Sequence, residues 1–248
     1  MERIGPAGTV GPTYCQRDRI CGSDVLPDFY RARDFRPAWT DNGLVLADAL
    51  SFLGALRLVA DDGLDPENYH LAALDSLLAE INAAKERKAK PVRPEALADL
   101  EMLLTDAFLL CGSHLVHGQV NPETLRSEWF IKGRFEDLAA VLEKGLAVND
   151  VPGALDSLRP GHAVYKGLKR SLRDYRALAD AGGWPEVPPG PKLVRGDRDA
   201  RVEAVRKTLA ATGDLIVAEG GDGDPAFFDD GLERSVKAFQ NRHGLEPD

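Results

Sequence analysis

Hydrophobic residues recur at helical spacing along most of the chain. The segment 42–60 carries a continuous apolar stripe formed by Leu46, Leu50, Leu53, Leu56 and Val59. The same spacing predicts further helices over residues 24–33, 71–88, 94–117, 135–146 and 163–181, of which 94–117 is the longest and most apolar. Residues 24–182 show no convincing alternation with a period of two. The pattern therefore predicts an all-α fold.

Several residues mark where these helices begin and end. Asp65 and Asn121 each precede a proline, an arrangement in which the polar side chain caps a helix and the proline takes its first position. A short helical turn is therefore expected after each of them. Gly118 is expected to end the long helix, since glycine readily adopts the left-handed conformation that follows many helices.

A change in composition divides the chain. Residues 182–191 are rich in glycine and proline, which is typical of a segment between domains. The sequence thus predicts an irregular N-terminal lead-in over residues 1–23, a helical domain over 24–185 and a small helical domain over 192–248.

Two helices are expected in the small domain, one capped by Asp199 and one opened by Asp230. Their inner faces are expected to carry Val202, Val205, Leu209, Leu232, Val236 and Phe239. Gly244 fits a left-handed residue at the end of the second helix, and the turn begun by Pro247 and Asp248 has no closing residue in this sequence. Because two helices make a thin core, we expect the small domain to be truncated at its C-terminal end.

Composition narrows the classes of partner. The chain has 248 residues, 44% of them hydrophobic, with a formal net charge of −9. This charge argues against a nucleic-acid partner, which would require clustered positive charge, and disfavours an anionic membrane surface. No apolar run approaches the roughly 20 residues that cross a bilayer, and no signal-peptide pattern follows Met1.

The three cysteines allow more than one interpretation. Cys111 lies in an apolar helical pattern and is most simply a small buried residue. Cys15 and Cys21 flank QRDRI in a segment rich in glycine and proline, where either a disulfide or two free thiols is consistent with the spacing.

The last part of the chain resembles the small peptidoglycan-binding domain of bacterial wall enzymes. The resemblance rests on the helix RVEAVRKTLAATGDL and on FDDGLERSVKAFQNRHGL, with its Val-x-x-Phe-Gln-x-x-x-Gly-Leu pattern from Val236 to Leu245. The preceding region resembles the helical scaffold domain of the large periplasmic L,D-transpeptidases. The matching segments are FYRARDFRPAWTDNG, DDGLDPENYHL, LLTDAFLLCGSHLVHGQVNP and YKGLKRSLRDYRALADAGGWPEVPPGPKL.

In that family a catalytic domain carries a Ser-x-Gly-Cys-x-Arg motif, whose thiolate attacks a stem peptide. None of the three cysteines here follows Ser-x-Gly. The resemblance therefore implies that the chain is the noncatalytic scaffold and peptidoglycan-binding portion of a periplasmic or cell-envelope enzyme, and that a catalytic domain follows Asp248. The alternative is a free-standing peptidoglycan-binding or adaptor protein. No catalytic residue and no cofactor is expected in this chain.

Candidate ligand-binding residues lie in the small domain. Polar side chains near helix ends, and arginines able to pair with stem-peptide carboxylates, are candidates for contacts with peptidoglycan: Asp229, Asp230, Gln240, Arg242, Arg198 and Arg201. A solvated helix face explains the same residues equally well.

His114 and His117 are three residues apart on a helix, with Asp106 two turns earlier, so both histidines could face one metal ion. Such a site would make the chain a metal-dependent wall hydrolase. Zinc needs three protein ligands, and no further cluster is placed to complete the set. We therefore predict no metal, and packing or surface roles for both histidines. Trp39, Trp129 and Trp184 are interpreted as packing anchors.

Overall fold

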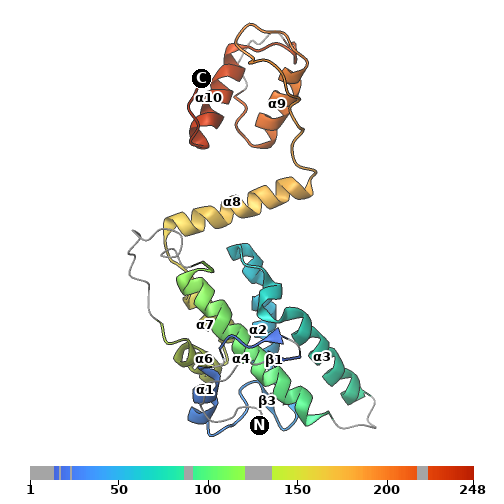
Figure 1. Cartoon of the computed structure of the whole chain (residues 1–248), viewed down its shortest axis with the longest axis vertical. Helices are drawn as coiled ribbons and strands as arrows, with labels where there is room; N and C mark the ends of the chain where they lie inside the picture. Colours follow the sequence, from blue (N-terminus) through green and yellow to red (C-terminus); the bar gives the residue numbers. More distant parts are fainter. Residues whose placement is uncertain (1–13, 17, 23, 87–91, 121–135, 217–222) are drawn as a thin grey trace. The chain divides into compact units, whose positions relative to one another are not determined.

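The computed structural model describes residues 14–16, 18–22, 24–86, 92–120, 136–216 and 223–248 and is mostly helical (Figure 1). It divides into two compact units, Met1–Lys169 and Arg170–Asp248. The all-α class predicted from the apolar periodicity is confirmed. Strand pairing is limited, in the described residues, to an isolated bridge and two antiparallel hairpins of two-residue strands.

The first unit begins with the hairpin β1 (Tyr14–Cys15) and β2 (Asp18–Arg19). Helix α1 (Leu26–Ala32) leads to a second hairpin, β3 (Thr40–Asp41) and β4 (Leu44–Val45). The remaining elements are α2 (Ala47–Arg57), the 3-10 turns η1 (Leu58–Asp62) and η2 (Pro66–Tyr69), α3 (Leu71–Glu86), α4 (Pro94–His117), α6 (Leu138–Ala147), α7 (Val151–Ser157) and the first part of α8 (Ala163–Asp180).

Helix α4 is the centre of this unit (Figure 1). It is apolar around much of its circumference and buries residues on all sides, as expected for a helix enclosed by other elements. Trp39 stacks on Phe52 of α2 with ring centroids 5.4 Å apart, and Phe52 lies 5.7 Å from Phe108 of α4. The aromatic side chains thus link the β3 segment, α2 and α4 in one core.

Most predicted boundaries agree with the structure to within a few residues. The long helix has the expected bounds, and Gly118 follows it with a φ of 83°. Asp65 accepts a hydrogen bond from the backbone N–H of Glu67, which confirms the predicted cap. The helix expected over 71–88 is described as far as Glu86. The turn predicted after Asn121, and Trp129, lie outside the described residues.

Helix α7 was not predicted. Its sequence, VPGALDS, is short and contains both proline and glycine, so its intrinsic helix propensity is low. Asp150 caps it by accepting the N–H of Gly153. A Cβ atom added to Gly145 of α6 would lie only 2.7 Å from Cβ of Ala154, so glycine is required where α6 and α7 approach. Close packing against α6 therefore stabilises this helix.

The second unit contains α9 (Arg201–Ala211) and α10 (Asp230–Arg242). Val202, Leu209, Phe228 and Leu232 form its buried core. Asp229 caps α10 by accepting the N–H of Leu232, whereas Asp230, expected to open the helix, is its first residue. Residues 183–199 contain neither helix nor strand, which includes most of the glycine- and proline-rich segment. The boundary between the compact units lies earlier, within α8.

Candidate functional site

A pocket of about 1090 Å³ opens on the first unit between α1, the segment 33–46 and α6. Phe29, Ala32, Pro37, Leu46, Ala139 and Ala140 supply apolar surface to it. Charged side chains line most of the rest, together with Val25, Thr40 and Asn42, and we call this cavity the α1–α6 pocket. A concave site with an apolar floor and a few polar groups is the usual form of a ligand site, and this pocket is slightly larger than the usual range of roughly 300–1,000 Å³.

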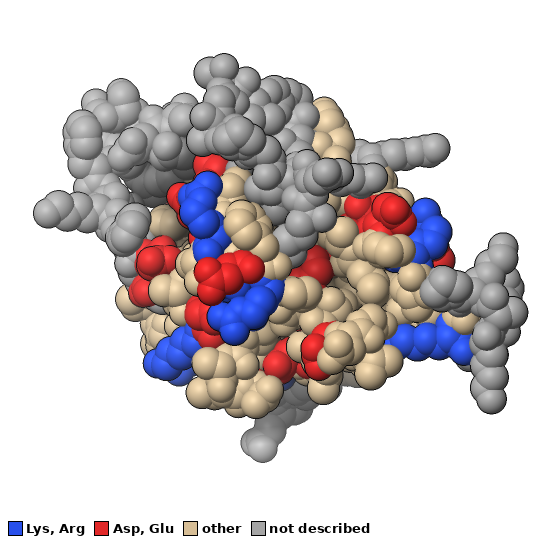
Figure 2. All heavy atoms as spheres, turned by 90° about the horizontal axis from the view of Figure 1, so that it is seen from below, with Lys and Arg blue, Asp and Glu red and all other residues tan. Residues whose placement is uncertain are grey.

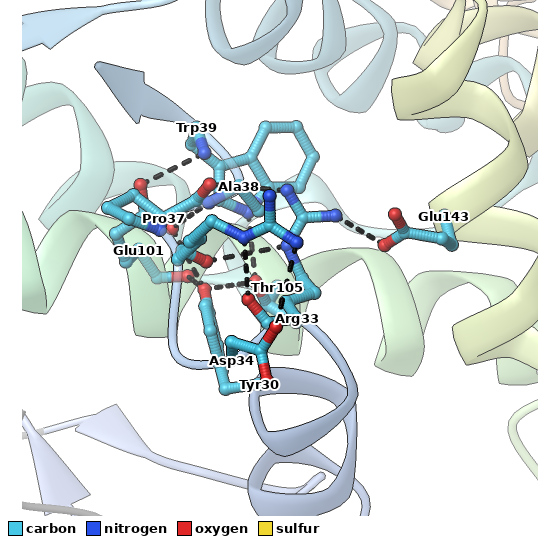
Figure 3. Close-up of polar contacts among 10 residues, drawn as sticks. Tyr30, Arg33, Asp34, Pro37, Ala38, Trp39, Glu101, Thr105 and Glu143 are labelled. Atoms are coloured by element: carbon cyan, nitrogen blue, oxygen red, sulfur yellow. Dashed lines mark hydrogen bonds and ion pairs between the residues drawn. The ribbon is translucent and has the colours of Figure 1, made fainter.

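Glu101 of α4 fixes the segment that walls the pocket (Figure 3). Its side chain is 3% exposed. Oε2 accepts the backbone N–H of Ala38 at 2.8 Å, and Oε1 accepts the N–H of Trp39 and the hydroxyl of Thr40, both at 2.9 Å. A carboxylate can be buried only when hydrogen bonds replace its hydration. The buried carboxylate thus accepts hydrogen bonds from three consecutive residues of the loop.

Tyr30 and Thr105 extend this network. The Tyr30 hydroxyl lies 3.0 Å from Glu101 Oε2 and 2.9 Å from Thr105 Oγ1, and Trp39 Nε1 donates to Thr105 Oγ1 at 2.8 Å. If Tyr30 donates to Glu101 and Thr105 donates to Tyr30, every polar hydrogen in the chain of contacts has an acceptor. Burial, and secondarily the nearby Glu101 charge, raises the pKa of Tyr30 well above its usual value, so it stays protonated.

Arg33 joins α1 to α6 across the pocket. Its guanidinium donates to the carbonyl oxygens of Pro37 and Arg36 at 3.2 and 3.4 Å and pairs with Glu143 of α6 (Figure 3). The guanidinium carbon also lies 5.5 Å from the centroid of the Phe29 ring. With these donors engaged, Arg33 acts as a brace for the pocket wall.

The pocket segment contains unusual backbone conformations. Asp34, Phe35 and Asn42 have φ values of 52°, 57° and 47°. Residues other than glycine rarely adopt this region, and each costs on the order of 1–3 kcal/mol unless the surroundings impose it. The hydrogen bonds accepted by Glu101 and those donated by Arg33 fix the intervening residues 36–40. The backbone of the pocket wall is therefore constrained to one conformation, which gives the pocket a defined shape.

A second buried network attaches the N-terminal hairpin to α4. His70, itself in a left-handed conformation with φ 62°, lies between Asp106 and Asp18, with Nε2 2.7 Å and Nδ1 3.1 Å from their carboxylate oxygens. Asp106 is fully buried and also accepts the N–H groups of Cys21 and Gly22. Because both ring nitrogens face carboxylates, the arrangement is complete when both carry a proton.

This network predicts a pH dependence of stability. Burial lowers the pKa of His70, but the hydrogen bonds and charges of Asp106 and Asp18 outweigh it and the net pKa is raised. The stabilisation is then fully present below the ordinary pKa of about 6.5 and is lost as the pH rises through the higher folded value. We expect His70→Gln to cost about 2 kcal/mol at pH 6 and less at pH 9, measured by urea unfolding. An equal cost at both pH values would contradict this.

The six residues predicted to bind peptidoglycan all engage other residues of the second unit. Asp229 pairs with Arg206, and Asp230 lies 3.3 Å from Arg195. In the same way Arg198 pairs with Asp224 and stacks on Phe227, and Arg201 pairs with Asp199. Gln240 donates to Asp248 at 2.9 Å. Finally Arg242 pairs with Asp214 and donates to the Tyr175 hydroxyl at 3.2 Å.

The histidines considered for a metal have other contacts. His114 Nδ1 lies 3.0 Å from the Tyr69 hydroxyl, and His117 Nδ1 lies 3.4 Å from Ser113 Oγ. Among the described residues, no group of three His, Cys, Asp or Glu side chains is placed to hold a metal ion. All three cysteines are free thiols, with Cys15 and Cys111 buried and Cys21 exposed.

The apolar pattern of the sequence does not reveal the α1–α6 pocket or the role of Glu101. A signal for Glu101 was present, because Asp99, Glu101, Thr105 and Asp106 interrupt the most apolar helix of the chain, and all four are buried. A polar side chain inside an apolar helix requires a partner from elsewhere in the fold. The periodicity does not say which segment supplies it.

Comparison with known proteins assigns the first unit to a class of noncatalytic helical scaffolds. A family model described as Scaffold domain matches residues 24–172. The chain therefore belongs to this family, the scaffold domain of L,D-transpeptidases. No curated protein matches the chain. Within the described residues, no helix is both long and apolar enough to span a membrane.

Proposed function

We propose that this chain is the noncatalytic scaffold and peptidoglycan-binding portion of a bacterial L,D-transpeptidase that cross-links stem peptides, and that it acts in the periplasm or cell envelope. The observation that carries the proposal is the family match over residues 24–172. The likeness of the small unit to peptidoglycan-binding domains supports the second part, since its apolar pattern makes the α9–α10 core. A free-standing peptidoglycan-binding or adaptor protein is the alternative.

The thiols of the chain support a noncatalytic role. A cysteine nucleophile needs an accessible thiolate. Burial raises the pKa of Cys111 to about 12, and the pKa of the exposed Cys21 is also raised, first by partial burial and then by the Asp106 charge. Cys15 is 1% exposed. None of these side chains combines exposure with a lowered pKa.

We predict that the whole chain sediments with insoluble peptidoglycan and forms no covalent adduct with a carbapenem. The double variant Asp230→Ala/Gln240→Ala is expected to reduce sedimentation about tenfold, since it removes two candidate polar contacts without removing the Asp229 cap. Intact-mass spectrometry after carbapenem treatment tests the second outcome.

The matched control is Asp61→Ala/Asn68→Ala, which removes one carboxylate and one amide from exposed positions of the first unit. Retention of wild-type sedimentation by the Asp230→Ala/Gln240→Ala variant would reject these contacts. Failure of the wild-type chain to sediment would reject the binding proposal altogether. A carbapenem adduct on any cysteine would overturn the noncatalytic assignment.

A further inference from the structure

The charges around the α1–α6 pocket are unbalanced. Asp24, Asp28, Asp41, Asp137 and Glu143 line it, against two basic side chains, Arg33 and Arg36. Figure 2 shows acidic and basic side chains intermixed over the coloured part of the face seen from below, with no broad basic patch there. The excess of acidic over basic side chains therefore concerns the pocket lining alone.

The basic side chains near the pocket are already engaged. Arg33 pairs with Glu143, while Asp28 pairs with Arg31. In the described part of the chain, no Lys, Arg or His forms an ion pair with Asp24, Asp41 or Asp137. Asp137 caps α6 by accepting the N–H of Ala140, and Asp41 accepts the Asn42 amide. These donors are a backbone N–H and a side-chain amide, so neither contact supplies a positive charge.

The same pocket offers apolar surface beside the carboxylates. The Phe29 ring is largely buried, and Ala32, Pro37 and Leu46 lie with it along the lining. Lysine and arginine side chains match such a surface, because their aliphatic stems cover apolar groups while the charged head reaches carboxylates. Arginine can also form paired hydrogen bonds with a carboxylate.

We propose that the α1–α6 pocket is a docking site for a basic peptide segment of a partner protein, held by Asp24, Asp41 and Asp137 around an apolar floor. The volume of about 1090 Å³ exceeds what one amine-bearing small molecule fills and suits several peptide residues. The braced loop gives the site a preformed shape, which lowers the entropic cost of binding. A scaffold domain with this pocket recruits a partner independently of any contact with peptidoglycan.

The test uses the full chain and fluorescence anisotropy with a labelled peptide of alternating leucine and arginine. We expect saturable binding that weakens with salt, and no binding of the analogue with glutamate in place of arginine. Asp24→Asn/Asp41→Asn preserves side-chain shape and removes two charges from the pocket. It is expected to weaken binding about tenfold, and Asp41→Lys to abolish it.

The matched control is Asp61→Asn/Glu67→Gln, which removes two exposed charges of the same unit outside the pocket. It is expected to bind the peptide within about twofold of the wild type, because nonspecific attraction to the acidic chain contributes little. Equal weakening by both double variants would overturn the proposal. It is also overturned if the basic peptide does not bind, if the glutamate analogue binds as well, or if free arginine amide binds with equal affinity.

Discussion

Glu101→Ala is expected to lower the free energy of unfolding of the first unit by about 4 kcal/mol. The substitution leaves the N–H groups of Ala38 and Trp39 and the hydroxyl of Thr40 without their acceptor. Trp39 is fully buried and Ala38 is 2% exposed, so water does not replace the lost oxygen atoms. Each unsatisfied buried donor costs on the order of 1–3 kcal/mol, and deletion of the side chain adds a cavity.

The measurement is hydrogen exchange of the α4 amides over a urea series, because it reports on the first unit alone. Glu101→Gln keeps one oxygen acceptor but turns an amide N–H₂ group toward other donors. We expect it to lower the free energy of unfolding by about half as much as Glu101→Ala. The exposed substitution Glu67→Gln serves as a control, with a change within about 0.5 kcal/mol. If the α4 amides of the Glu101→Ala variant are as well protected from exchange as those of this control, the buried carboxylate does not hold the loop.

Asp62→Ala is expected to lower the free energy of unfolding by about 3 kcal/mol. The Asp62 side chain is 1% exposed and meets three donors within the first unit. They are Arg159 Nε at 2.8 Å, the Tyr165 hydroxyl at 2.6 Å and Lys169 Nζ at 2.5 Å. Removal of the carboxylate leaves Arg159, which is 17% exposed, without its buried counter-charge. The start of α8 is then expected to detach from η1, with faster amide exchange over residues 163–169.

This cluster also has a predicted acid limit. Burial raises the pKa of Asp62, but hydrogen bonds from Lys169, Tyr165 and Arg159 outweigh it and leave the pKa below its usual value. The stabilisation is therefore present above the unfolded pKa of about 3.9 and is lost as the pH falls through the lower folded value. Urea unfolding at a series of pH values between 2 and 7 tests whether the free energy of unfolding falls with the pH as expected.

The matched control for Asp62→Ala is Asp156→Ala. Asp156 pairs with the same arginine at 3.0 Å but is 77% exposed, so solvent replaces it and the expected loss is within about 0.5 kcal/mol. Equal losses for Asp62→Ala and Asp156→Ala would show that burial of Asp62 has no special effect. A gain in stability of Asp62→Ala near neutral pH would reject the cluster as a stabilising contact.

The elements that were predicted well are those whose signals are local. Helix α4 follows from its apolar residues, with Pro94 at its start and Gly118 after its end. The cap at Asp65 and the left-handed Gly244, with φ 69°, also depend on residues a few positions away. Helix α7 and the short hairpins depend on distant partners, so the periodicity does not reveal them.

Residue chemistry was likewise recognisable, but its spatial arrangement was not. The candidate residues of the second unit were selected as polar groups near helix ends, and the structure gives each an intramolecular contact. Their binding role remains the proposal tested by sedimentation. Glu101 and Asp62 are ordinary acidic residues in the sequence, and only their burial beside loop N–H groups or basic side chains makes them important.

The sequence alone defines the all-α class, the main helix boundaries and the family resemblance, because these depend on spacing and on short-range capping. The tertiary structure places Glu101 under residues 38–40, His70 between two aspartates, and α1 opposite α6 around an acidic pocket. The physical reason is that a buried charge takes its partners from wherever the folded chain brings donors within hydrogen-bonding distance. Those distances are set by packing of the whole unit, which no local pattern encodes.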